Sequence, residues 1–145
     1  MKSAILFLTL LFICGSAQAN CNFAQAERAE ASVDNLKTWQ AVYESFKQYA
    51  GCDDGDIAEG YSDGVVKLLA YHWNDFASMQ KFTSADPEFY DFVIKHIDAT
   101  TDWDDLKALI LHASHECPKN ARTLCLDIKR KASLAYQEAK SVGGG

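Results

Sequence analysis

Positive charge is in short supply in this chain. There are 14 Lys and Arg residues against 20 Asp and Glu, which gives a formal net charge of −6. Proteins that bind nucleic acid need Lys and Arg to neutralise phosphates, so the composition argues against a nucleic-acid partner. An acidic surface suits a basic protein partner better.

Familiar catalytic and metal-binding motifs are also absent from the sequence. It has no G-x-S-x-G and no glycine loop for phosphates. The order His112-Ala-Ser-His115-Glu116 differs from the H-E-x-x-H of metalloproteases, and Asp53–Asp56 lacks the full calcium-loop pattern. A metal on His112, His115 and Cys117 would need a cysteine that we expect to be in a disulfide. We therefore expect no metal, no cofactor and no enzymatic activity.

Long apolar runs are missing except at the N-terminus. Lys2 precedes an apolar run, Ala4–Ile13, and then the small-residue sequence Ala17-Gln18-Ala19. This order is typical of a secretory signal peptide, and the run is shorter than the roughly 20 residues that span a bilayer. We expect residues 1–19 to be cleaved before Asn20 and the protein to be exported, with no membrane attachment afterwards.

Cysteines predict two disulfides in the exported chain. Of the 5 cysteines, Cys14 leaves with the signal peptide, and an even number in an exported protein indicates disulfides with three possible connectivities. We favour Cys21–Cys52 and Cys117–Cys125. Eight residues of helix rise about 12 Å, and a disulfide joins Cα atoms up to roughly 7 Å apart. Cys117 must therefore lie outside the helix that carries Cys125.

Cys52–Asn74 predicts the central helix of the fold. The acids between Cys52 and Ile57 suit a helix start. The residues that follow recur at helical spacing and share one face: Ile57, Tyr61, Val65, Leu68 and His72. We expect His72, at the end of this face, to lie in the core. Gly60 and Gly64 lie one turn apart and each costs roughly 1 kcal/mol in helix propensity. Close approach of a neighbouring helix would offset that cost.

Helical patterns fill most of the remaining chain, and no strand pattern, internal repeat or long linker interrupts them. We predict an all-α fold: a small disulfide-stapled bundle of about five or six helices in one domain, residues 20–140, with a flexible tail at 141–145. A short turn of helix is expected near residues 22–26. Further helices are expected at about 36–50, 75–81, 87–97, 101–116 and 120–139.

Three segments resemble the Tai group of type VI secretion amidase immunity proteins, in particular its fourth subfamily. They read CDDGDIAEGYSDGVVKLLAYHW, ADPEFYDFVIKHIDATTDWDDL and CPKNARTLCLDIKRKA. The resemblance implies a periplasmic, all-helical homodimer that binds and inhibits a peptidoglycan amidase with a Cys–His site, delivered by a neighbouring cell. It also implies that a protruding loop enters the amidase cleft, assisted by a helix of the second subunit.

Two connectors are candidates for that loop, Phe82–Asp86 and Asp98–Trp103. The first is slightly favoured because Pro87 would hold it rigidly. The candidate partner-binding residues are Thr83, Ser84, Ala85, Asp86, Ala99, Thr100, Thr101 and Asp102.

Two other functions are compatible with the same composition. One is a general periplasmic inhibitor or adaptor of another cell-wall hydrolase, such as a lysozyme. The other is a small helical enzyme with a histidine at its centre, which survival of activity after replacement of each histidine would exclude.

Overall fold

The computed structural model describes residues 21–143; all regular elements in that part of the chain are helices, and it contains no strand. Short 3₁₀ turns at Ala50–Cys52, Trp73–Asp75 and Lys119–Ala121 link some of the helices. The expected all-α class is confirmed. The predicted signal peptide, residues 1–19, lies outside the described residues, as do Gly144 and Gly145. The seven α-helices are α1 (Phe23–Val33), α2 (Trp39–Tyr49), α3 (Gly55–Tyr71), α4 (Phe76–Ala85), α5 (Pro87–Lys95), α6 (Trp103–His115) and α7 (Arg122–Gly143).

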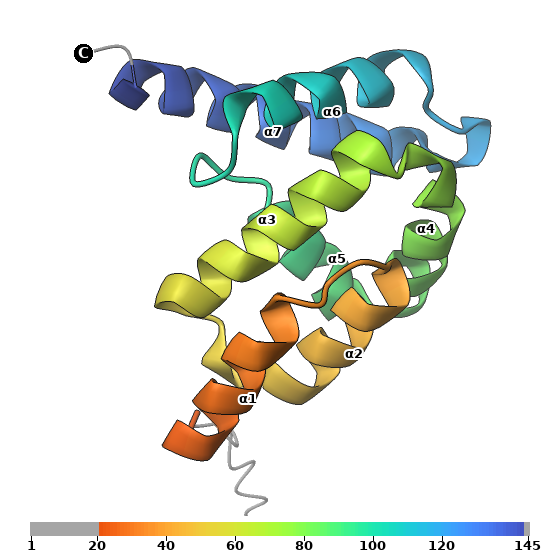
Figure 1. Ribbon diagram of the computed structural model, residues 1–145. Helices are drawn as coiled ribbons and strands as arrows, with labels where there is room; N and C mark the ends of the chain where they lie inside the picture. Colours follow the sequence, from red (N-terminus) through yellow and green to blue (C-terminus); the bar gives the residue numbers. More distant parts are fainter. Residues whose placement is uncertain (1–20, 144–145) are drawn as a thin grey trace, which may run out of the picture.

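Helix α3 lies at the centre, as the sequence predicts. It runs diagonally between the α6–α7 pair and the α1–α2 pair and contacts α1, α2 and α6 (Figure 1). Asp54 caps its first turn by accepting a hydrogen bond from the Gly55 amide at 2.9 Å. The buried residues of α3 include Tyr61, Val65, Leu68 and Leu69. The prediction for His72 is wrong: it follows the last residue of α3 and is exposed.

The two glycines of α3 face the end of α1 and the chain just after it. A Cβ atom at Gly60 would lie 2.8 Å from Cβ of Val33, and one at Gly64 would lie 2.9 Å from Cβ of Leu36. Both distances are shorter than carbon atoms tolerate, so a larger residue would push α3 away. The close approach expected from the sequence is confirmed.

Both predicted disulfides are present. Cys21–Cys52 joins the start of α1 to the turn before α3, with Cα atoms 4.9 Å apart. Cys117–Cys125 closes the α6–α7 hairpin, with Cα atoms 6.0 Å apart. Cys117 lies outside both helices, which the predicted geometry required.

Three helix boundaries differ from the sequence prediction. The turn expected at 22–26 is a helix of 11 residues, α1, which starts with a capping box between Asn22 and Gln25. Helix α4 continues to Ala85, so the connector expected at 82–85 is wrong. Helix α7 continues to Gly143, so residues 141–143 of the predicted tail are helical.

Candidate functional site

The α4–α5 junction is too short to form a loop. Asp86 ends α4 and caps α5, and its Oδ1 accepts hydrogen bonds from the amides of Glu88 (3.1 Å) and Phe89 (3.3 Å). Its Oδ2 accepts from the Tyr43 hydroxyl and Lys47 Nζ, both at 3.2 Å. Asp86 is thus the N-cap of α5, and this single residue makes the whole turn.

The other residues predicted for this connector belong to the last turn of α4. Thr83 is buried and donates its hydroxyl hydrogen to the Gln80 carbonyl at 3.3 Å, whereas Ser84 and Ala85 are exposed on the helix surface. Phe82 stacks on Tyr43 with ring centroids 4.6 Å apart. This packing continues the buried stripe of α4 and leaves no segment that protrudes.

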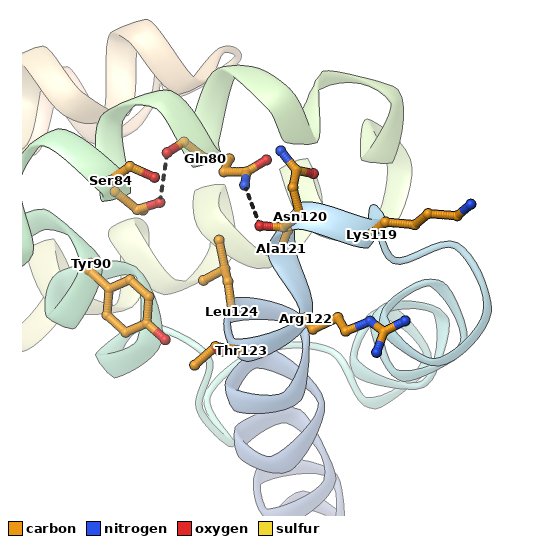
Figure 2. Close-up of a pocket in the computed structure, with 10 residues that line it drawn as sticks. Gln80, Ser84, Tyr90, Lys119, Asn120, Ala121, Arg122, Thr123 and Leu124 are labelled. Carbon is orange, nitrogen blue, oxygen red and sulfur yellow. Dashed lines mark hydrogen bonds between the residues drawn. The ribbon is translucent and has the colours of Figure 1, made fainter.

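A pocket of about 440 Å³ lies beside this turn, between α4, α5 and the start of α7 (Figure 2). Gln80 bonds across it to the Asn120 carbonyl at 3.2 Å. Lys119 and Arg122 extend away from Ser84 and Tyr90, so the positive charges do not converge inside (Figure 2). The Gln80–Asn120 hydrogen bond ties α4 to the turn before α7. This is a structural role, so we do not choose this pocket as the site.

Tyr90, at the edge of the pocket, also uses its polar group to join two helices. Its hydroxyl donates to Asp127 Oδ2 at 2.5 Å. Burial and the Asp127 carboxylate together raise the pKa of Tyr90 to about 12. The phenol therefore stays protonated and holds α5 against α7.

The α5–α6 connector, residues 96–102, is a true loop and stands out from the side of the molecule (Figure 1). Asp98 organises it: Oδ1 accepts hydrogen bonds from the Thr100 amide (2.9 Å) and the Thr100 hydroxyl (2.6 Å). The Thr101 hydroxyl donates to the Asp98 carbonyl at 2.9 Å. Asp102 caps α6 by accepting from the Asp104 amide at 2.7 Å. These hydrogen bonds tie the loop to its own backbone and to the first turn of α6.

Three of the four residues predicted for this loop reach the surface. Thr100 and Asp102 are exposed and Ala99 is half-buried, whereas Thr101 is buried. Trp103, directly after the loop, is 47% exposed, and Lys140 Nζ lies 5.7 Å from the centroid of its ring. The loop thus presents small and acidic groups beside an exposed aromatic ring.

A buried polar network lies at the base of this loop. His96 is 1% exposed, and its Nδ1 lies 3.0 Å from Ser62 Oγ on α3. Its Nε2 lies 3.1 Å from Asp53 Oδ2, which also accepts from Lys95 Nζ at 2.6 Å. Ser62 donates in turn to Asp98 Oδ2 at 2.7 Å. The network therefore connects the loop to α3 and to the disulfide-bonded turn before it.

Both carboxylates of the network ionise more readily than usual. Burial raises the pKa of Asp53, but hydrogen bonds from His96 and Lys95 outweigh it and the pKa is lowered. Burial likewise acts on Asp98, and hydrogen bonds from Ser62 and Thr100 lower its pKa. Both side chains are therefore hydrogen-bond acceptors at neutral pH.

The order Ser62–His96–Asp53 resembles a nucleophile, a base and the group that orients the base. Its geometry does not suit nucleophilic attack. Ser62 is 1% exposed and donates its hydroxyl hydrogen to Asp98 rather than to the imidazole. The arrangement suits an anchor for the loop.

Sequence reasoning chose His72 as the buried histidine and missed His96. The signal was present: His96 follows Phe92 by four residues and so continues the buried stripe of α5. A histidine on such a stripe needs polar partners. Those partners come from distant segments, so the local pattern does not identify them.

Metal ligation by His112, His115 and Cys117 finds no support in the geometry. His112 lies 3.1 Å from the Ala70 carbonyl and 2.8 Å from Glu116, and Cys117 is in a disulfide. Within residues 21–143, no three His, Cys, Asp or Glu side chains are grouped so that they could hold a metal ion.

None of the helices within residues 21–143 combines the length and apolar character needed to cross a membrane. Comparisons with protein-family models, curated proteins and solved structures gave no match.

Proposed function

We propose that this protein is a periplasmic immunity protein that binds a type VI secreted peptidoglycan amidase and blocks its active-site cleft. The observation that carries the proposal is the loop at residues 96–102, which protrudes and is braced by hydrogen bonds to Asp98. The resemblance of the sequence to amidase immunity proteins supports the same conclusion.

A rigid loop suits inhibition because binding then orders little additional chain. Ala99 and Thr100 are small enough to enter a narrow cleft beside a catalytic thiol. Asp102 is exposed and suits pairing with a protonated histidine in such a site. The acidic composition further favours association with a basic enzyme surface.

The compartment belongs to the same proposal. Two disulfides favour an oxidising environment, and the predicted signal peptide makes that environment the periplasm. We further propose a homodimer, on the resemblance alone, in which a helix of the second subunit assists the loop.

The test places a bulky side chain at each of the two junctions that flank α5 and compares the effect on inhibition. Ala99→Trp places a large ring on the loop, and Ala85→Trp places the same ring on the exposed end of α4 as the matched control. Inhibition of the proposed partner, a Cys–His peptidoglycan amidase, is measured together with circular dichroism. We expect Ala99→Trp to weaken inhibition at least tenfold, about 1.4 kcal/mol, and Ala85→Trp to inhibit like the parent.

Two outcomes would contradict the proposal. If both variants inhibit as well as the parent, the loop does not enter the cleft. If the parent protein leaves the amidase active but inhibits a lysozyme, the class of target is wrong and the protein is an inhibitor of another hydrolase.

A further inference from the structure

We propose that the outer face of the α6–α7 hairpin binds the headgroups of anionic phospholipids, so that the protein attaches to a membrane surface without spanning it. This surface, the basic face, comprises two rows of exposed side chains: Trp103, Lys107 and Leu111 on α6, and Arg122, Leu126, Arg130 and Leu134 on α7. The proposal goes beyond inhibition of an amidase and does not rest on it. It departs from the expectation that the exported protein has no membrane attachment, which rested on the lack of a second long apolar run.

Charge is divided unevenly along the chain. Residues 21–118 carry 7 Lys and Arg against 18 Asp and Glu, whereas residues 119–143 carry 6 Lys and Arg against 2 Asp and Glu. The acidic composition of the whole chain therefore does not describe α7, which is a basic helix. A basic surface favours a partner with negative charge.

Cationic and apolar side chains alternate along the α7 row. Arg122, Leu126, Arg130 and Leu134 follow one another at four-residue spacing, and all four are exposed. Residues four apart are neighbours on the surface of a helix, so each leucine lies next to an arginine. Of the six large apolar side chains that are exposed within residues 21–143, four belong to the basic face.

The α6 row repeats the alternation with Trp103, Lys107 and Leu111, again at four-residue spacing and exposed. Helices α6 and α7 pack along each other on the side of the molecule away from α1 and α2 (Figure 1). Lys140 Nζ, near the end of α7, lies 5.7 Å from the centroid of the Trp103 ring at the start of α6. The surfaces of the two helices are therefore continuous there.

The cations of the basic face are available to a ligand. Neither Lys107 nor Arg122 has a salt-bridge partner within residues 21–143, and the side chain of Arg130, which pairs with Asp127, is 73% exposed. Screening confines repulsion between lipid phosphates and more distant acidic side chains to about 10 Å at about 0.1 M salt. The contacts at the face itself therefore govern binding.

The alternation favours a lipid surface over a protein partner. The centre of a protein interface is depleted of charged residues, and its polar groups lie at the rim. On the basic face, a cation separates the apolar residues along each row. A bilayer surface suits this order, because apolar side chains enter between the headgroups while long cationic side chains reach the phosphates. Tryptophan, as at position 103, is enriched at membrane–water interfaces.

The direct test measures binding of the purified, disulfide-bonded protein to vesicles by cosedimentation. One set of vesicles contains phosphatidylcholine alone, and the other contains phosphatidylcholine and phosphatidylglycerol in equal amounts. We expect binding to the anionic vesicles to be at least about tenfold tighter. This binding should be lost when salt rises from about 0.1 M to about 1 M, because the Debye length falls from about 10 Å to about 3 Å. Equal binding to both sets, or to neither, would overturn the proposal.

A matched pair of variants tests whether the charge must lie on the basic face. Lys107→Glu with Arg122→Glu reverses two charges on the face, and Lys37→Glu with Lys81→Glu makes the same change in net charge at exposed positions elsewhere. We expect the first variant to bind the anionic vesicles about tenfold more weakly than the second. Equal losses would show that overall charge governs binding, which would refute the proposal.

Sedimentation equilibrium without vesicles examines the alternative occupant, the acidic part of a second copy. Self-association that Lys107→Glu with Arg122→Glu abolishes would assign the face to that copy and overturn the lipid proposal. Circular dichroism verifies that each variant is folded. None of these measurements uses an amidase, so a failure of lipid binding leaves the proposed function intact, and a failure of inhibition leaves this proposal intact.

Discussion

The two junctions that flank α5 use the same residue type to opposite effect. At the α4–α5 junction, Asp86 caps the next helix and bonds Tyr43 and Lys47, and the chain turns within a single residue. At the α5–α6 junction, Asp98 bonds Ser62 on α3 and its own neighbours, and the chain forms a loop over residues 96–102.

The environment of each carboxylate explains the difference. Lys47, the charged partner of Asp86, is 52% exposed, so water competes for that pair. Ser62 and His96, which hold the base of the loop, are each 1% exposed. An aspartate that caps a helix ends one element and begins another, whereas an aspartate that bonds buried groups fixes a protruding segment.

We expect the largest effect from removal of the buried anchor. Asp98→Ala removes the nearer of the two acceptors of Ser62, leaving the Ala58 carbonyl at 3.1 Å, and reduces the negative charge around the buried His96. Each unsatisfied buried polar group costs about 1–3 kcal/mol, so we expect the free energy of unfolding to fall by about 3 kcal/mol in urea titrations. If Asp98→Ala lowers the free energy of unfolding by less than Asp86→Ala does, the buried anchor of the loop is not the stronger of the two junctions.

The next effect tests whether the loop depends on the position of α3. Gly64→Leu introduces a side chain where a Cβ alone would lie 2.9 Å from Leu36 Cβ. We expect overpacking to destabilise the protein by about 1–3 kcal/mol. Ser62 should shift with α3, so the Thr100 amide should also lose protection. An unchanged melting temperature would mean that the segment around Leu36, after α1, moves freely to accommodate the new side chain.

A smaller effect is expected at the other junction. Asp86→Ala removes the cap of α5, and loss of such a cap typically costs about 1 kcal/mol. The Lys47 pair should add little because Lys47 is exposed. Thermal unfolding followed by circular dichroism measures the change, and the Thr100 amide serves as the control because its exchange should not respond.

The smallest effect on stability is expected when the pH is lowered. The pKa values of Asp53 and Asp98 are lowered by their hydrogen bonds, so their contribution to stability is complete above the unfolded value of about 3.9. It is lost as the pH falls below that value and through the folded pKa. Asp98→Asn should therefore show a shallower acid limb than the parent in denaturant titrations at several pH values. Identical acid limbs would contradict the lowered pKa of Asp98.

Local features of the sequence determined much of the fold. Helical spacing predicted the central helix, and the four cysteines left after the predicted signal peptide predicted the two disulfides. Gly60 and Gly64 indicated a close approach because their cost in propensity needs compensation. All of these depend on short spacings along the chain or on the count of one residue type.

Only the tertiary structure decided which connector is a loop and which histidine is buried. Polar residues at 82–86 and at 98–102 look alike in the sequence. Thr83, however, is buried in the last turn of α4, whereas Asp98 accepts a hydrogen bond from Ser62, 36 residues away. His96 finds its partners 34 residues away in Ser62 and 43 residues away in Asp53. Hydrogen bonds across such separations form only when the helices have packed, because nothing in the neighbouring residues specifies them.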